Sequence, residues 1–251
     1  MKIKLDYKYL CIVGDIHGEF RELAWIIDQK KFEDTAFIVA GDFGLGFYKK
    51  GYYEREYQHI KKKLESGNNC ILGLRGNHDD PEYYNPESEL FLNYPVFKAL
   101  PDYTRLTWGD REILVIGGAT STDKDWRIAE MSKKPEKKLW WEDERPIKDF
   151  SRVETKEDII ISHEAPLNIG PVLMRTSNLD LETYRNIIED REYLGKVLKE
   201  SRPSRYYFGH YHCSTSGDWG ETLWKGLDIN EIVEVRQCNL QELMRTIKYY
   251  L

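Results

Sequence analysis

Five of the six histidines in this chain lie in short clusters with Gly, Asp, Asn or Ser, and each cluster follows an apolar run of strand length. Asp42 follows another such run, and only His59 lies elsewhere, in a charged helical stretch. The clusters are Asp15-Ile16-His17, Gly41-Asp42, Gly76-Asn77-His78-Asp79, Ser162-His163 and Gly209-His210-Tyr211-His212. Because ligands in open α/β sheets bind at the carboxyl ends of the strands, we expect these loops to meet at one rim.

The order of the apolar runs predicts an α/β chain. In the first third, short buried strands alternate with amphipathic helices, which is typical of βαβ units. The strands of this part are expected at 9–13, 36–40 and 70–74, and the helices at 20–27 and 52–64. After about residue 95 the pattern indicates a hairpin with a Gly109-Asp110 turn, more strands and one long helix. These strands are expected at 106–108, 113–116, 159–161, 206–208, 222–227 and 232–235, and the helix at 181–199.

Composition restricts the class of protein. A length of 251 residues without a Pro/Ser-rich linker predicts a single domain, residues 1–251. A formal net charge of -6 argues against a surface that binds duplex nucleic acid. The four cysteines have no CxxC spacing, so we expect reduced thiols. The sequence shows neither a signal peptide nor a run of membrane-spanning length, which predicts a cytoplasmic protein.

The residue types in the clusters predict a metal site. Histidine nitrogens and Asp or Asn oxygens suit Mn, Fe or Zn, whereas they suit thiolate-selected ions poorly. Seven such side chains are too many for one tetrahedral ion, but they fit two ions that share a carboxylate and lie about 3.5–4 Å apart. The predicted cofactors are therefore two divalent metal ions, with Mn preferred and Fe or Zn as alternatives.

The ordered set GDIHG, GD, GNHD, SH and GHYH, over residues 15 to 212, resembles the motifs of the calcineurin-like metallophosphoesterases. This resemblance implies an α/β (α+β) fold, a four-layer αββα sandwich with two facing mixed β-sheets and the metal site at the strand-end rim. It also implies which side chains bind which ion. One ion is expected on Asp15, His17 and His212, the other on Asn77, His163 and His210, with Asp42 bridging them.

The resemblance also assigns His78 as a catalytic histidine that binds no metal. In the implied reaction, a hydroxide bridging the two ions attacks phosphorus, and His78 protonates or stabilises the departing alkoxide. Asp79 is expected to orient the His78 imidazole, although a partner elsewhere in the fold is the alternative. The planar guanidinium of Arg75, together with Asn77, is expected to contact the substrate phosphate.

The segment from about 123 to 152 is rich in both signs of charge and interrupts a strand-rich region, so we expect an insertion that covers the substrate. Within it, Lys124 and Arg127 are expected to bind phosphate oxygens. For Trp126, Trp140 and Trp141 two interpretations stay open, namely packing beneath a long loop or a wall that stacks on a base. The block GGATSTDKDWR resembles a subgroup of small bacterial and phage metallophosphoesterases.

Together these features predict a binuclear metal-dependent hydrolase of phosphomonoesters or phosphodiesters. Small phosphorylated or nucleotide substrates are favoured, with no stable duplex nucleic acid partner, no membrane and an open oligomeric state. One alternative is a serine/threonine protein phosphatase, because LRGNHD resembles a block of those enzymes. Their GDxVDRG motif is replaced here by GDFGLGF, so Leu45 and Gly46 occupy the positions of its second Asp and its Arg.

Two further alternatives concern the use of the same fold. A nuclease would need a basic groove and a capping domain, and neither is obvious in this sequence. A non-enzymatic metal-binding interaction module is disfavoured, because His78 and every expected ligand are present.

Overall fold

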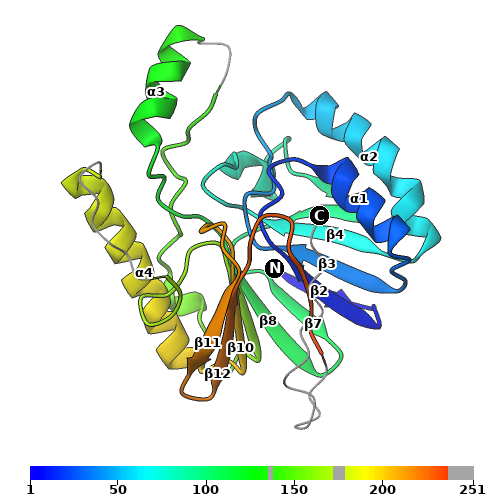
Figure 1. Ribbon diagram of the computed structural model, residues 1–251. Helices are drawn as coiled ribbons and strands as arrows, with labels where there is room; N and C mark the ends of the chain where they lie inside the picture. The colour runs from blue at the N-terminus through cyan, green and yellow to red at the C-terminus, as the bar shows by residue number, and fades with distance from the viewer. Residues whose placement is uncertain (135–137, 172–178, 237–251) are drawn as a thin grey trace.

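A computed structural model describes residues 1–134, 138–171 and 179–236 (Figure 1). Within these residues the chain forms two mixed sheets, one of six strands and one of seven. The order in the six-stranded sheet is β13 (Ile232–Glu234), β2 (Tyr9–Val13), β3 (Thr35–Val39), β4 (Cys70–Leu74), β6 (Phe97–Leu100) and β5 (Asn93–Tyr94). The order in the seven-stranded sheet is β1 (Lys2–Leu5), β7 (Arg105–Trp108), β8 (Arg111–Ile116), β9 (Ile159–Ser162), β10 (Arg205–Phe208), β12 (Thr222–Gly226) and β11 (Thr215–Trp219).

Helices cover the outer face of each sheet (Figure 1). α1 (Phe20–Gln29) and α2 (Lys50–Ser66) share a core with the six-stranded sheet, and α4 (Leu181–Ser201) shares one with the seven-stranded sheet. A third core lies between the two sheets. The expected four-layer αββα sandwich with facing mixed sheets is therefore confirmed. No helix among the described residues has the length and apolar character needed to cross a bilayer.

The two-sided burial of the central strands explains why they appear in the sequence as continuous apolar runs. In β9, Ile160 packs toward α4, whereas Ile159 and Ile161 pack into the core between the sheets. All five residues of β3 are buried. Successive side chains of a strand point to opposite faces, so a sheet covered on both sides needs apolar residues at every position.

The parallel pairing within each sheet sets the position of the loops. β2, β3 and β4 pair in parallel, and so do β8, β9 and β10. Their carboxyl ends therefore lie along one edge of each sheet. The clusters with His and Asp all begin within three residues of these ends, which is the rim that the sequence predicts.

Some elements were not expected from the sequence. β1 and β11 have too many polar residues for a strand pattern, and β5 has only two residues. The helix α3 (Lys124–Lys133) was also missed, because Arg127 is its one buried residue and no apolar stripe marks it. Cys11, Cys70 and Cys213 are free thiols as expected, and Cys238 lies outside the described residues.

The segment of 123–152 lies between β8 and β9, and α3 stands away from the sandwich (Figure 1). Polar contacts attach both sides of this segment to α4. The buried carboxylate of Asp190 in α4 accepts the Thr120 hydroxyl at 2.6 Å and the Arg145 Nε–H at 3.0 Å. The base of the α3 arm is thereby fixed to the helix that covers the seven-stranded sheet.

Candidate metal centre

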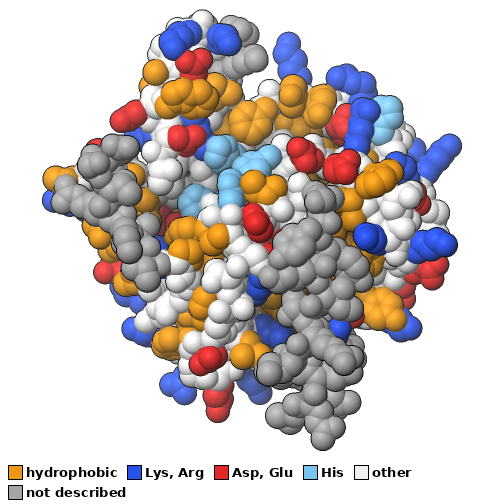
Figure 2. Space-filling model, in the orientation of Figure 1, with side chains coloured by type: hydrophobic (Ala, Val, Ile, Leu, Met, Phe, Trp, Pro, Cys, Tyr) orange, Lys and Arg blue, Asp and Glu red, His pale blue; other side chains and the backbone are white. Residues whose placement is uncertain are grey.

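Histidine side chains gather on one face of the molecule, beneath the arm that ends in α3 (Figure 2). They come from loops that are far apart in the sequence, following β2, β9 and β10 and the end of β4. His59 is exposed on α2 and takes no part. The sheet topology thus brings together what the sequence distributes over almost two hundred residues.

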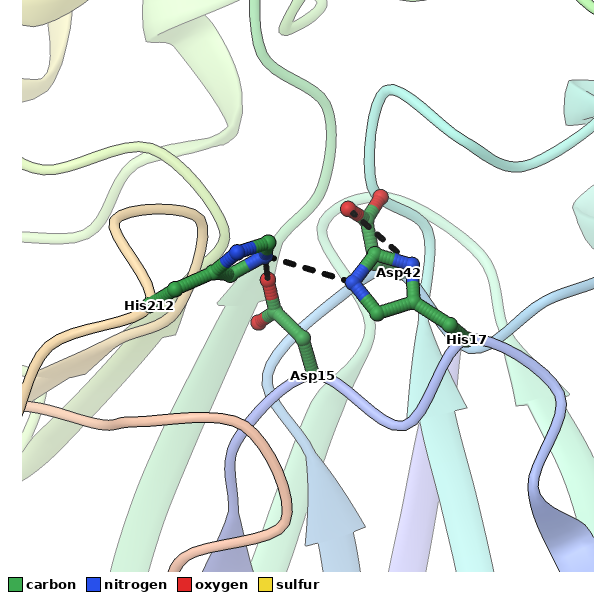
Figure 3. Close-up of side chains that lie close together, drawn as sticks. All are labelled: Asp15, His17, Asp42 and His212. Carbon is green, nitrogen blue, oxygen red and sulfur yellow. Dashed lines mark hydrogen bonds and ion pairs between the residues drawn. The ribbon is translucent and has the colours of Figure 1, made fainter.

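Four side chains of this group point toward one another (Figure 3). Asp15, His17, Asp42 and His212 each offer one ligand atom, and these atoms all lie within 4.8 Å of one another. The His212 Nε2 is 3.1 Å from Asp15 Oδ2 and 3.2 Å from His17 Nε2. Two imidazole nitrogens and two carboxylates that converge on one point are a donor set that a divalent cation such as Mn, Fe or Zn fits.

Asp42 lies between this group and a second one. Its Oδ2 is 3.9 Å from His17 Nδ1, while its Oδ1 is 3.3 Å from His163 Nε2 and accepts the backbone N–H of His78 at 2.9 Å. The carboxylate is buried, with 1% of the residue exposed. One oxygen therefore faces each group, which is the placement that a bridging ligand requires.

The second group contains Asn77, His163 and His210. The Asn77 Oδ1 is 3.0 Å from His163 Nε2, and the rings of His163 and His210 have centroids 4.9 Å apart. The backbone N–H of His210 donates to both oxygens of Asp15 at 3.1 Å. All seven expected ligands therefore lie in one continuous cluster around Asp42 and Asp15.

Backbone strain coincides with this cluster. His17, Asp42, His210 and His212 have φ angles of 45°, 43°, 69° and 46°. Left-handed backbone is unfavourable for residues other than Gly, and such strain persists where the surrounding structure imposes it, often at functional sites. The folded loops hold these four side chains in place at a local energetic cost.

Two glycines allow the loops to approach the carboxylates. A Cβ on Gly76 would lie 2.0 Å from Asp42 Oδ1, and one on Gly209 would lie 2.1 Å from Asp15 Oδ1. Real Cβ atoms do not approach oxygen so closely, so any side chain at either position would displace the carboxylate. The glycines of GNHD and GHYH are therefore required by packing at the cluster.

The buried charges of the cluster depend on one another. Burial alone would raise the pKa of Asp42, but the imidazoles of His163 and His78 outweigh it and hold the pKa well below its usual range. Burial alone would lower the pKa of His163, but Asp42 and Asp15 outweigh it and raise the pKa to about 10. The two carboxylates thus require positive charge here, and a divalent cation would replace the proton on His163 in that role.

Arg75 differs from its expected role. It is 2% exposed, its Nε donates to Asp102 at 2.8 Å, and its two terminal nitrogens donate to backbone carbonyls of residues 143–145 at 2.8–3.1 Å. These bonds fix the insertion to the loop after β4. The guanidinium thereby supports the site through bonds within the protein, and its expected contact with the substrate phosphate stays a prediction.

Asp79 also differs from its expected role. Its buried carboxylate accepts four backbone N–H groups, those of Phe43, Gly44, Leu45 and Gly76, at 2.6–2.9 Å. No described hydrogen bond joins the Asp79 side chain to the His78 ring. Asp79 instead connects the loop after β3 to the loop after β4, and so fixes the position of Asp42 relative to Asn77.

The His78 ring contacts Arg127 instead. The Arg127 guanidinium is close to His78 Nε2, donates to the Asn77 carbonyl at 3.1 Å, and forms an ion pair of 2.9 Å with Asp123. Burial, opposed by Asp42 and assisted by Arg127, lowers the pKa of His78. Because a guanidinium can only donate, the His78 Nε2 that faces it acts as an acceptor.

The tryptophans of the insertion have different environments. Trp141 is 1% exposed and packs edge-on against Phe47, so the packing interpretation applies to it. Trp126 is 62% exposed on α3. Trp140 is half-buried, and Lys124 Nζ lies 4.9 Å from the centroid of its ring. No described hydrogen bond joins Lys124 to the metal cluster.

Sequence reasoning missed several residues that support the ligands. Ser121 accepts the Asn77 side-chain amide at 2.9 Å and donates to the buried Glu144 at 2.5 Å. Glu164, directly after His163, is buried with one oxygen 3.8 Å from His210 Nε2. Only the position of Glu164 beside a predicted ligand could have drawn attention to it.

The sequence and the fold of this chain are similar to those of known proteins. The family model described as calcineurin-like phosphoesterase matches residues 9–214. The match to one solved structure covers 91% of this chain and 95% of that chain, with 13% identity and a TM-score of 0.50. A putative 5'-nucleotidase from Staphylococcus aureus, solved with alpha-ketoglutarate, covers 96% of this chain with 14% identity and a TM-score of 0.42, and this chain spans about half (52%) of it.

Another similar structure is the anchor protein in the inner membrane complex of Plasmodium. It has 12% identity and a TM-score of 0.46, and the match covers 96% of this chain and 88% of that one. No curated protein matches the chain significantly. At 13% identity, the structure with the TM-score of 0.50 shows similarity of fold alone.

The fold and the rim cluster define a class, that of two-sheet αββα proteins with a His/Asp site of metal-binding type at the strand ends. Within that class the family match extends over most of the sequence. The chain belongs to the calcineurin-like phosphoesterase family.

The substitution Gly209→Ala tests the packing of the cluster. We expect it to displace Asp15 and to weaken Mn²⁺ binding by about 10-fold or more, on the scale of changes next to a ligand. Gly51→Ala is the matched control, because a Cβ there meets only the end of Arg55, at 4.0 Å. Calorimetric titration of chelator-stripped protein measures the effect. Equal affinities in the two variants would contradict the packing argument.

The substitution Asp79→Ala tests the connecting role of this carboxylate. We expect the free energy of unfolding of metal-free protein to fall by about 3–5 kcal/mol, because four buried N–H groups lose their acceptor. Asp79→Asn retains one carbonyl oxygen and should lose less. Urea unfolding followed by circular dichroism measures both changes. Unchanged stability combined with lost turnover would support the orienting role instead.

Proposed function

We propose that this protein is a binuclear metal-dependent phosphoesterase that hydrolyses phosphomonoesters or phosphodiesters of small phosphorylated molecules or nucleotides. The observation that supports it most is the placement of Asp42, with one oxygen toward Asp15, His17 and His212 and the other toward His163 and Asn77. Membership of the calcineurin-like phosphoesterase family points to the same chemistry.

Each of the two groups of side chains would hold one metal ion. Asp15, His17 and His212 would hold one ion, Asn77, His163 and His210 the other, and Asp42 would touch both. Bound there, two divalent ions supply an activated water and neutralise phosphoryl oxygens. The oxygen and imidazole donors favour Mn, with Fe or Zn as alternatives.

His78 and Arg127 form the part of the proposal that concerns the substrate. The guanidinium of Arg127 is 2% exposed, yet it lies beside the His78 ring and Asn77 at the edge of the cluster. A phosphoryl oxygen that enters here would accept from Arg127, which frees His78 Nε2 to hold or move a proton at the leaving oxygen. The insertion thus supplies an arginine at the edge of the cluster.

This arrangement argues against a protein phosphatase. At the positions of the missing Asp-Arg pair, Leu45 is buried, and a Cβ on Gly46 would lie 2.4 Å from Asp80 Cβ and 2.8 Å from Trp141. No side chain of any size fits at Gly46. The cation beside the cluster therefore comes from α3 and not from the loop after β3. The exposed Trp126 on the same helix suits a substrate with a base or another flat group.

A phosphoester panel tests the proposed function. Chelator-stripped protein, reloaded with Mn²⁺, Fe²⁺ or Zn²⁺, should hydrolyse chromogenic mono- or diesters or nucleotides and should lose activity on chelation. Asp42→Ala should abolish turnover because it removes the shared carboxylate. His59→Ala, on the exposed face of α2, is the control. A wild-type protein that binds two ions and hydrolyses nothing on the panel would overturn the proposal.

A double-mutant cycle tests His78 and Arg127. We expect His78→Ala to keep its bound metal and to lose about 10²–10⁴-fold in kcat. Arg127→Gln should lose about 10- to 100-fold in kcat/KM, since a hydrogen bond to a charged group is worth about 1.5–3 kcal/mol. The double variant should lose less than the product of the two, because the side chains are in contact.

The control for the cycle is Lys133→Gln, which removes an exposed cation paired with Glu130 on the same helix. It should leave kcat/KM unchanged. Loss of metal in His78→Ala, or strictly multiplicative losses in the cycle, would show that the two residues do not act together on the substrate.

A further inference from the structure

The carboxylate of Glu164 is buried with one oxygen that has no hydrogen-bond partner among the described residues. Glu164 follows His163 at the end of β9 and is 0% exposed. Its Oε1 accepts the Ala165 N–H at 2.7 Å and the Tyr211 hydroxyl, whereas its Oε2 accepts nothing. Leaving a buried carboxylate oxygen without a hydrogen bond is costly in free energy, so we expect a donor close to it.

The unpaired oxygen faces one nitrogen of a proposed ligand. Glu164 Oε2 lies 3.8 Å from His210 Nε2, and the His210 ring packs edge-on against the neighbouring Tyr211 ring. A hydrogen bond from Nε2–H would require these two atoms to come closer by about 1 Å. The other ring nitrogen, Nδ1, is then left as the acceptor that can bind a cation.

His163 in the same group has the opposite arrangement. Its Nδ1 lies 2.9 Å from the Ala40 carbonyl, which can only accept, so Nδ1 bears the proton. Its Nε2 is the nitrogen that faces Asp42 and Asn77. Two neighbouring histidines thus have their tautomers set by different partners, a backbone carbonyl for His163 and a carboxylate for His210.

We propose that Glu164 is a positioning residue that accepts Nε2–H of His210 and so presents Nδ1 to the ion held with Asn77 and His163. This inference rests on the proposed function, since it concerns one ion of the proposed pair. Carboxylates that accept the free N–H of a metal-binding histidine fix its tautomer and increase its basicity. Glu164 lies within the matched residues 9–214 but outside the sequence motifs that drew attention to the ligands.

The surroundings of Glu164 keep its carboxylate in place. The Tyr211 hydroxyl that donates to it lies next to Arg191, whose guanidinium carbon is 5.7 Å from the Tyr211 ring centroid. Arg191 is buried in α4 and donates to the carbonyls of Pro166 and Ile169, in the loop after β9. Tyr211 thus holds the Glu164 carboxylate, and Arg191 packs against Tyr211.

Calorimetric titration of chelator-stripped full-length protein with Mn²⁺ tests the proposal. We expect Glu164→Ala to weaken one of two sites by about 10- to 100-fold, the usual range for a partner of a ligand, with the other site unchanged. Glu164→Gln, whose amide oxygen still accepts, should weaken that site less. The unchanged site serves as the measure of correct folding.

Glu157→Gln is the matched control. Glu157 lies just before the other end of β9, is also buried, and also has an unpaired Oε2, but its partner is Arg105. This variant should bind two ions with wild-type affinities. Any loss of stability that comes merely from changing a buried glutamate will appear in it as well.

Nitrogen-15 NMR of the Zn²⁺-loaded protein gives a second readout without turnover. We expect His210 to be protonated on Nε2 and His163 on Nδ1. The proposal is overturned if His210 is protonated on Nδ1, if Glu164→Ala leaves both affinities unchanged, or if it weakens both equally. A wild-type protein that binds fewer than two ions would instead count against the proposed function itself.

Discussion

The buried carboxylate of Asp42 is the element on which the rest of the site depends. It lies where the six-stranded and seven-stranded sheets meet at the rim, and its oxygens face histidines from loops after β2 and β9. A buried anion in such a place must have nearby positive charge, which the His163 imidazolium provides in the protein alone. The same requirement makes the cluster a favourable place for divalent cations.

The loops around Asp42 are held by backbone contacts more than by side-chain pairs. The Asp79 carboxylate accepts four backbone N–H groups from two loops. Gly76 and Gly209 allow the backbone to contact the carboxylates of Asp42 and Asp15. The left-handed residues of the cluster are tolerated because these contacts impose their conformation. In the proposed function, such a preorganised arrangement would lower the reorganisation needed when ions and a phosphoester bind.

The insertion between β8 and β9 contacts the His/Asp cluster. Its helix α3 buries a single residue, Arg127, and places it against His78 and Asn77. Arg75 and Asp190 fix the base of the arm, while Trp126 at its surface stays exposed. In the proposed function, a cation that comes from this insertion would take part in the choice of phosphoester.

Strand and helix periodicity in the sequence predicted an α/β chain, and the residues directly after the strands brought all seven proposed ligands to notice, because both are local features. The αββα sandwich was implied by the resemblance of the ordered motifs to the calcineurin-like family. The hydrogen-bond partners of Arg75 and Asp79, and the position of Glu164 beside His210, were decided only by the tertiary structure. The guanidinium of Arg75 bonds to carbonyls about seventy residues away, Asp79 to a loop about thirty-five residues away, and Glu164 faces His210 from a different strand end. Hydrogen-bond partners at such separations leave no periodic signal in the sequence. The groups that these side chains bond to are not their neighbours along the chain.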